Sequence, residues 1–198
     1  MSVAIKVENV ENAIILRFNR PEIKNSLSLE TLAELEELIN SAEQTSAIER
    51  IIFTGTGGTF ASGANLNEIA ALNAETARAF GLRGQHLMQM IYHSKKLTVA
   101  AIDGFCMGGA LDLAVACQKR IASPRSVFAH PGVNLGIMTG WSGTQMLPRL
   151  IGEAAALEMF LTAKRVDAEE ALRIGLIDEI SDVPLADSLA NFGAIRSS

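Results

Sequence analysis

A carboxylate, Asp112, lies among the apolar residues of the segment IDGFCMGGALDLAVAC, which extends from Ile102 to Cys117 and carries Asp103 at its start. It follows Gly109, the second residue of a glycine pair, by three positions. Glycines have no Cβ, so the backbone can approach a ligand closely, and the first N–H groups of a helix lack internal partners. A helix that begins near Gly109 would place a free N–H and Asp112 on one face, about 5–6 Å apart. The spacing therefore favours a site where a backbone donor and a carboxylate face the same space.

A structural role is the alternative, because an acidic residue in the first turn of a helix also stabilises the helix dipole. The segment FTGTGGTFASGANLNEI (53–69) nevertheless contains a second glycine-rich loop, Ser62-Gly63-Ala64, between a predicted strand and a predicted helix. Its GTGG stretch (55–58) is a turn, since it lacks the Lys-Ser/Thr or spaced glycines of a phosphate-binding loop. Two loops of this kind make a ligand site the better interpretation.

Histidine is the other candidate for acid–base chemistry, because its charge changes near neutral pH. His130 precedes Gly132 by two residues, so an extended backbone would turn both toward one side. Pro131 disturbs this alternation, and a histidine that bonds only to the backbone is the simpler alternative. His86 is a weaker candidate on a predicted helix, and Cys117 belongs to the core.

The composition limits the classes of protein that fit. The 198 residues, 48% of them hydrophobic, suit one domain with a sizeable core. A formal net charge of −5 argues against a nucleic-acid surface, and two cysteines form neither a disulfide framework nor a metal knuckle. No apolar run is long enough to span a membrane, and the N-terminus lacks the layout of a signal peptide. We expect a soluble, cytoplasmic protein without nucleic-acid or membrane partners.

Hydrophobic periodicity predicts an α/β chain. Residues 14–18, 50–55 and 97–103 resemble buried strands, and residues 28–44 carry leucines at helical spacing behind a Ser28 N-cap. Further helices are expected over residues 74–93, 153–161 and 167–173. Because these elements alternate to the end without a linker or repeat, the sequence predicts one domain over residues 1–198.

Four segments carry motifs in a fixed order. They are NRPEIKNSLS (19–28), FASGANLNE (60–68), GFCMGGALDLAVACQKRIA (104–122) and FAHPGVNLGIMTGWSGTQMLPRLIG (128–152). The set resembles the enoyl-CoA hydratase/isomerase (crotonase) family from about residue 5 to residue 180. The resemblance implies an α/β spiral of repeated β-β-α units, a fold shared with Clp-type peptidases, and assembly into homotrimers or hexamers. The apolar segment of residues 146–161 would support these contacts between subunits.

The resemblance also implies an oxyanion hole for the thioester carbonyl of an acyl-CoA, formed by the backbone N–H groups of Ala64 and Gly109. Coenzyme A would then be part of the substrate, and no separate cofactor or metal is expected. The remaining positions that the resemblance assigns to binding fall into two sets. Asn65, Leu66 and Asn67 would line the pantetheine and acyl path, and Lys24, Ser26 and Leu27 would border the nucleotide portion of CoA. Gly132 and Trp141 are further candidates for the acyl pocket, although packing is the alternative for Trp141.

The departures from the family pattern concern the acid–base residues. Hydratases of the family use two glutamates, which align here with Asp112 and with Gly132. A further acid of the dienoyl-CoA isomerases aligns near Gly140. The expected function is therefore hydration or isomerisation of an enoyl-CoA in fatty acid metabolism, by a lyase or isomerase with a reduced acid–base set in which Asp112 and His130 remain.

Two alternatives stay open at this point. One is an acyl-CoA-binding or assembly protein without turnover, since one catalytic position is empty and the chain stops before most of the family's C-terminal helical segment. The other is a hydrolase, because Cys106-Met107-Gly108 resembles the nucleophile segment of Clp-type peptidases and His130 could activate the thiol.

Overall fold

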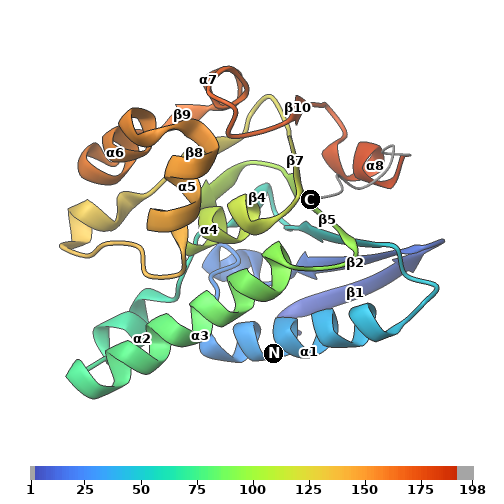
Figure 1. Cartoon of the computed structure of the whole chain (residues 1–198), viewed down its shortest axis with the longest axis horizontal. Coiled ribbons are helices and arrows are strands. Elements are labelled where there is room, and N and C mark those ends of the chain that lie inside the picture. The colour runs from blue at the N-terminus through green and yellow to red at the C-terminus, as the bar shows by residue number, and fades with distance from the viewer. Residues whose placement is uncertain (1–2, 191–198) are drawn as a thin grey trace.

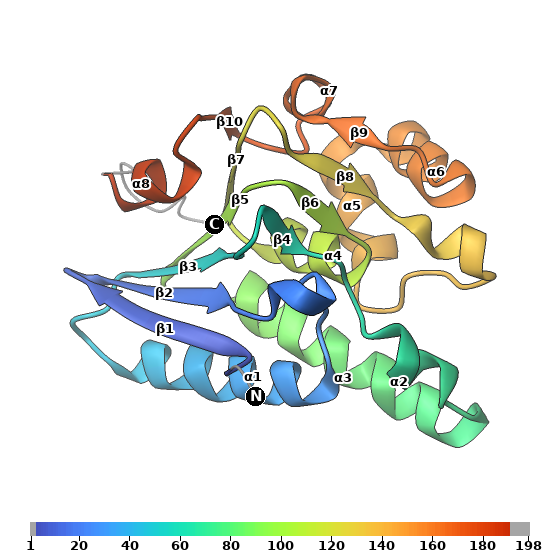
Figure 2. The same cartoon turned by 180° about the vertical axis from the view of Figure 1, so that it is seen from behind.

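The computed structural model describes residues 3–190, and Figures 1 and 2 show it from two opposite sides. The strands are β1 (Ile5–Val10), β2 (Ala13–Phe18), β3 (Arg50–Thr54), β4 (Thr59–Ala61), β5 (Leu97–Ile102), β6 (Phe105–Met107), β7 (Lys119–Ala122), β8 (Val127–Ala129), β9 (Val166–Asp167) and β10 (Glu179–Ile180). The helices are α1 (Leu29–Gln44), α2 (Leu66–Ala70), α3 (Ala74–Tyr92), α4 (Gly109–Ala116), α5 (Gly143–Ile151), α6 (Glu153–Thr162), α7 (Ala168–Arg173) and α8 (Pro184–Leu189). Two short 3₁₀ helices, η1 (Pro21–Ile23) and η2 (Pro131–Leu135), complete the described part.

The strands form two sheets that the chain builds turn by turn. The larger sheet has the order β1-β2-β3-β5-β7-β10, and the smaller has the order β4-β6-β8-β9. Each of the turns β3–β4, β5–β6 and β7–β8 adds one strand to each sheet and then enters a helix. Within each sheet the strands of these turns are parallel to one another, whereas β9 pairs with β8 in the antiparallel direction. The predicted spiral of β-β-α units is therefore confirmed.

The larger sheet is buried on both faces. Alternate residues of β2, β3 and β5 pack against the layer of helices α1, α3, α4, α5 and α6. The other alternate residues form a second cluster, which Leu185 and Leu189 of α8 cover. Burial of both faces explains why these strands read as continuous apolar runs in the sequence. The predicted strands and helices agree with the structure to within one residue at most ends, and Ser28 caps α1 by accepting from the N–H of Thr31 at 3.1 Å.

Four helical segments that lie between the strands of the smaller sheet in the sequence are found at one end of the molecule. Figures 1 and 2 agree that α2, the start of α3, η2 and α6 lie at this end. The sequence interpretation of an extended backbone beyond His130 is wrong, because residues Pro131–Leu135 turn into the 3₁₀ helix η2. This turn carries the loop before α5 back across the beginning of α4.

Candidate active site

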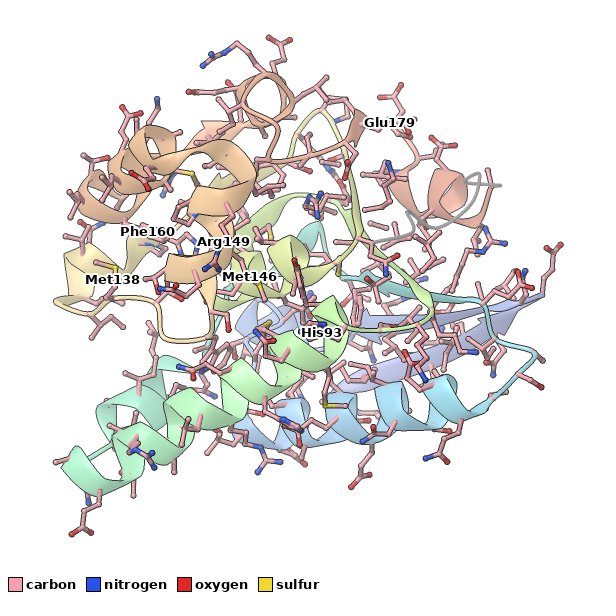
Figure 3. All side chains as sticks on the ribbon, in the orientation of Figure 1. His93, Met138, Met146, Arg149, Phe160 and Glu179 are labelled. Carbon is pink, nitrogen blue, oxygen red and sulfur yellow. The ribbon has the colours of Figure 1, made fainter. Side chains whose placement is uncertain are left out.

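A cavity of about 280 Å³ opens at the end of the molecule where α2, α3 and η2 meet. Its walls are mainly apolar and come from segments far apart in the sequence. Figure 3 labels two side chains that line it, Met138 before α5 and Phe160 of α6. Further lining side chains are Leu66, Ile69, Leu72, Phe80, Val133, Leu135, Ile137 and Trp141. Such a cavity suits an apolar chain and leaves polar recognition to a few groups.

Two backbone N–H groups face this cavity without partners. Ala64 and Gly109 both line it, and within the described residues neither N–H donates a hydrogen bond to another group. The two loops touch at Gly63, whose φ of +93° is a conformation that favours glycine. A Cβ on Gly63 would lie 3.0 Å from the nitrogen of Gly109 and 2.6 Å from the carbonyl oxygen of Met107. Glycine is thus required for the loops to bring both donors to one place.

The segment of residues 24–27 holds the first of these loops from behind. Leu27 donates to the carbonyl of Gly63 at 2.8 Å and accepts from the N–H of Asn65 at 3.0 Å. The carbonyl of Lys24 accepts from the N–H of Ser62 at 3.0 Å. Lys24 is exposed and Ser26 is half-buried, and neither they nor Leu27 line the cavity. Their predicted place beside the nucleotide of CoA stays a prediction.

Of the three predicted path residues after Ala64, only Leu66 lines the cavity. The side chain of Asn65 caps α2, accepting from the N–H of Asn67 at 2.9 Å and from that of Glu68 at 3.4 Å. Asn67 is exposed on the same short helix. Asn65 therefore fixes the loop, and the predicted role of these three residues along the pantetheine and acyl path stays a prediction.

Asp112 lies in the first turn of α4 but does not reach the cavity. Only 1% of its surface is exposed, and Thr139 Oγ1 donates a hydrogen bond to Oδ2. Gly143 approaches so closely that a Cβ there would lie 2.0 Å from Oδ1. Burial raises the pKa of Asp112 to about 7, although Thr139 and the backbone N–H groups of Gly143 and Trp141 favour the charged form. The prediction that the Gly109 N–H and the Asp112 carboxylate face the same open space is wrong, because Asp112 is buried and does not line the cavity.

His130 stands between that carboxylate and the cavity. Its ring lines the cavity, only 3% of its surface is exposed, and Nε2 lies 3.4 Å from Oδ1 of Asp112. Neither of these two atoms has a hydrogen-bond partner in the described part of the chain. Phe160 packs against the imidazole with ring centroids 4.9 Å apart, and burial lowers the pKa of His130 to about 4. The ring is therefore neutral at physiological pH.

Trp141 forms part of the cavity wall that Ala64 and Gly109 also line. Its ring is buried between two glycines, because a Cβ on Gly84 of α3 or on Gly109 would lie 2.0 Å or 2.5 Å from ring atoms. Phe80 packs against it with centroids 5.3 Å apart. Trp141 thus packs against neighbouring residues and also lines the cavity, so its predicted packing role and its predicted place in the pocket are compatible.

Gly132 and Gly140, the two positions where the resemblance implies further acids, differ in the space around them. Gly132 and Gly140 both line the cavity, and none of the described lining residues carries a carboxylate. A Cβ on Gly132 would lie 2.6 Å from the carbonyl oxygen of Ile137, whereas a Cβ on Gly140 would have nothing within 4 Å. Only Gly140 leaves room for a side chain.

The remaining candidates lie outside the cavity. His86 is exposed on α3, and Cys106 is fully buried in β6 and does not line the cavity. Burial raises the pKa of the Cys106 thiol well above its ordinary value, so it holds its proton and cannot act as a nucleophile at neutral pH. The geometry thus removes the basis for a thiol hydrolase.

Sequence reasoning missed Thr139, which bonds to Asp112, and Gln85, whose Nε2 donates to the carbonyl of Gly140 at 2.8 Å. Thr139 directly precedes Gly140, a position that the family resemblance had already marked. Within residues 3–190, no three acidic, histidine or cysteine side chains lie close enough to bind a metal ion. No helix in this range has the length and apolar character to cross a membrane.

Comparison with known proteins agrees with this geometry. Residues 8–191 match the family model described as enoyl-CoA hydratase/isomerase. The chain is 38% identical over 177 residues to the crotonyl-CoA hydratase of Syntrophomonas wolfei subsp. wolfei, covering 89% of this chain and 68% of that protein. It is 36% identical over 175 residues to the short-chain-enoyl-CoA hydratase of Clostridium acetobutylicum, covering 88% of this chain and 67% of that protein.

Solved structures give the same result. The enoyl-CoA hydratase of Bacillus anthracis superimposes with a TM-score of 0.88 at 33% identity, over 95% of this chain and 74% of that chain. DspI of Pseudomonas aeruginosa superimposes with a TM-score of 0.89 at 34% identity, over 96% and 78% of the two chains. On the evidence of the motifs, the fold and these relatives, the chain belongs to the enoyl-CoA hydratase/isomerase family.

Proposed function

We propose that the protein binds an enoyl-CoA thioester and hydrates it or shifts its double bond, with the thioester oxygen held by the N–H groups of Ala64 and Gly109. The observation that carries this proposal is the pair of free donors on one wall of an apolar cavity. Formation of an enolate places negative charge on that oxygen. One fixed donor of this kind stabilises a transition state by about 2.7–4 kcal/mol.

Two features support an acyl-CoA as the substrate, namely the apolar cavity and an exposed lysine outside it. The side chains around the donors are apolar, so an acyl chain can lie against Leu66, Phe80 and Trp141. The exposed Lys24 sits behind the donor loop, where its ammonium group could meet a phosphate of CoA outside the cavity. Relatives named as crotonyl-CoA and short-chain-enoyl-CoA hydratases support a short enoyl chain.

A protein that binds acyl-CoA without turnover is the second candidate. One specific observation favours it, namely that no carboxylate lines the cavity within the described residues. The buried Asp112 beside His130 favours turnover instead, because a carboxylate enclosed without a task would only destabilise the fold.

Calorimetric titration with crotonyl-CoA and acetoacetyl-CoA tests the proposal, and free CoA is the control. We expect both thioesters to bind more tightly than CoA, and crotonyl-CoA to lose its enoyl thioester absorbance when enzyme is added. Binding without any loss of absorbance, for crotonyl-CoA and for its β,γ-isomer, would favour the second candidate. No binding of any thioester would refute the proposal.

We further propose that the chain assembles as a homotrimer or hexamer. The apolar side chains of Leu157 and Leu161 on α6 are 53% and 60% exposed in the single chain, which suits a surface that another subunit covers. Light scattering at micromolar concentration checks this assembly, and a monomer would contradict it.

A further inference from the structure

We infer that His130 is the group that carries the proton at this site, and that Asp112 and Thr139 are positioning residues that orient it. The inference rests on the proposed function, because it concerns a proton of the bound thioester. His130 is the only titratable side chain among the described residues that line the cavity. Any acid–base step that a side chain of the described part performs on a bound acyl group must therefore pass through this imidazole.

The geometry around His130 explains how a buried imidazole can be a base. Nε2 faces Oδ1 of Asp112 at 3.4 Å, and both atoms are otherwise without partners in the described part of the chain. A proton on Nε2 would be directed at the carboxylate, which leaves the lone pair of Nδ1 for the cavity. Which nitrogen carries the proton is normally set by the partner of the other nitrogen. The carboxylate also stabilises the imidazolium that forms when Nδ1 takes a proton.

Thr139 and the start of α5 hold the carboxylate in this orientation. Thr139 Oγ1 donates to Oδ2, so that Oδ1 remains turned toward His130. Gly143 fits against Oδ1 without a side chain, and the backbone N–H groups of Gly143 and Trp141 favour the charged carboxylate. Phe160 closes the other side of the imidazole. The imidazole of His130, the carboxylate of Asp112 and the hydroxyl of Thr139 therefore form one group, in which His130 separates the buried carboxylate from the cavity.

The step that this unit performs is balanced without a further reactant. The C–H bond at the α-carbon breaks, its proton moves to Nδ1 of His130, and its electron pair moves onto the thioester oxygen beside Ala64 and Gly109. The imidazolium then returns a proton to the α-carbon, which exchanges hydrogen with solvent. In a β,γ-enoyl thioester it can instead protonate the γ-carbon of the dienolate, which moves the double bond to the α,β position. No oxidant, reductant or metal takes part.

Exchange of the α-protons of butyryl-CoA in D₂O, followed by proton NMR, tests the inference independently of hydration. We expect His130→Gln to slow the exchange by about 10²–10⁴-fold, the usual worth of general acid–base help, while calorimetric affinity for butyryl-CoA changes less than threefold. His86→Gln is the matched control, because His86 is exposed on α3, and its exchange rate should equal the native rate.

The positioning role of Thr139 has its own readout. The titratable group that faces the imidazole is Asp112 of α4, and Phe160 of α6 packs against the ring. The thiol of Cys106 in β6, whose pKa burial raises, interacts with Asp112. The exchange rate should therefore rise with pH as Asp112 ionises. Thr139→Val removes a hydrogen bond to the charged carboxylate and should move this midpoint up by about one pH unit, and Thr139→Ser should restore it. A merely structural hydroxyl would change the rate without moving the midpoint.

The outcomes separate the two proposals. Undiminished exchange in a folded His130→Gln variant, or a midpoint that Thr139→Val leaves in place, would overturn the inference. Native protein that binds butyryl-CoA but catalyses no exchange would also overturn it, while leaving thioester binding intact. Failure of the native protein to bind any thioester would instead refute the proposed function, and the inference with it.

Discussion

The two sides of the cavity are held in different ways. On the donor side, Ala64 and Gly109 present backbone N–H groups from loops that fit only because Gly63 has no side chain. On the acid–base side, the site depends on side chains, and the family's second carboxylate position is Gly132. A backbone donor survives most changes of side chain, whereas an acid is lost by one substitution. The proposed donor side therefore depends on backbone conformation, whereas the proposed acid–base side depends on the identity of single side chains.

The largest loss of stability is expected when Gly63, which brings the two donor loops together, is replaced by alanine. Gly63→Ala adds a Cβ at 2.6 Å from the carbonyl of Met107, in a residue whose φ is +93°. We expect a loss of about 2–6 kcal/mol in the free energy of unfolding, from backbone strain and overpacking together, and a loss of thioester affinity. Urea denaturation and calorimetry measure the two effects.

Gly136→Ala is the control for strain alone, since its φ is +69° and a Cβ there would meet nothing within 4 Å. It should cost only about 1–2 kcal/mol. Equal losses in the two variants would contradict the claim that the loops need close contact at Gly63.

The buried carboxyl group of Asp112 should make the free energy of unfolding depend on pH. Burial holds the pKa of Asp112 at about 7, above its ordinary value, so the native state retains a proton that the unfolded chain releases near pH 4. The contribution of this group to stability is therefore present at low pH and is lost as the pH rises toward 7. Asp112→Asn removes this dependence. Its free energy of unfolding relative to the native protein should grow by about 2–3 kcal/mol from pH 5 to pH 8.

His130 does not obscure this comparison. Burial lowers its pKa to about 4, so its own contribution is lost as the pH falls below its ordinary value, and it does so in both proteins. Urea denaturation of both proteins at several pH values measures the difference. A difference that stays constant from pH 5 to pH 8 would show that Asp112 ionises as it would in water.

The wall between the two sides should be sensitive to packing at a single position of α3. Gly84→Ala would place a Cβ 2.0 Å from the ring of Trp141, and we expect a loss of about 1–3 kcal/mol in the free energy of unfolding. Gly81→Ala on the same helix meets nothing within 4 Å and should instead stabilise by about 0.5–1 kcal/mol. Thermal or urea denaturation distinguishes the signs, and the same sign for both would disprove the tight fit of Trp141.

Restoring an acid should work at only one of the two empty positions. Gly140→Glu enters open space, and we expect it to raise the hydration of crotonyl-CoA by about tenfold, below the full worth of an optimally placed acid. Gly132→Glu, although it matches the family's position, would push a Cβ to 2.6 Å from the carbonyl of Ile137 and should destabilise the loop without this gain. Loss of the enoyl absorbance measures both rates. A larger gain at Gly132 would show that the loop rearranges freely.

The sequence predicted most of the fold because its signals were local. Buried strands such as residues 97–103 were continuous apolar runs, and Ser28 marked the start of α1. The donor loops could also be predicted, since Gly63 and the glycine pair at the start of α4 are patterns in consecutive residues.

The acid–base unit could not be predicted in the same way. Asp112 and His130 are 18 positions apart in the sequence, and their contact depends on η2 turning the chain back across α4. Local spacing indicated that Asp112 would face the ligand, but the loop that carries Thr139 covers it. Nothing in the neighbouring residues encodes that cover, which arises from packing of α5 against α4.

The proposed function depends on the N–H groups of Ala64 and Gly109 holding the thioester carbonyl oxygen. Infrared difference spectroscopy of butyryl-CoA with a ¹³C-labelled carbonyl reports on that bond directly, and the unlabelled compound identifies its band. Two donors that polarise the carbonyl should lower its stretching frequency in the complex relative to free butyryl-CoA. A bound thioester whose carbonyl frequency equals or exceeds that of the free compound would contradict the account.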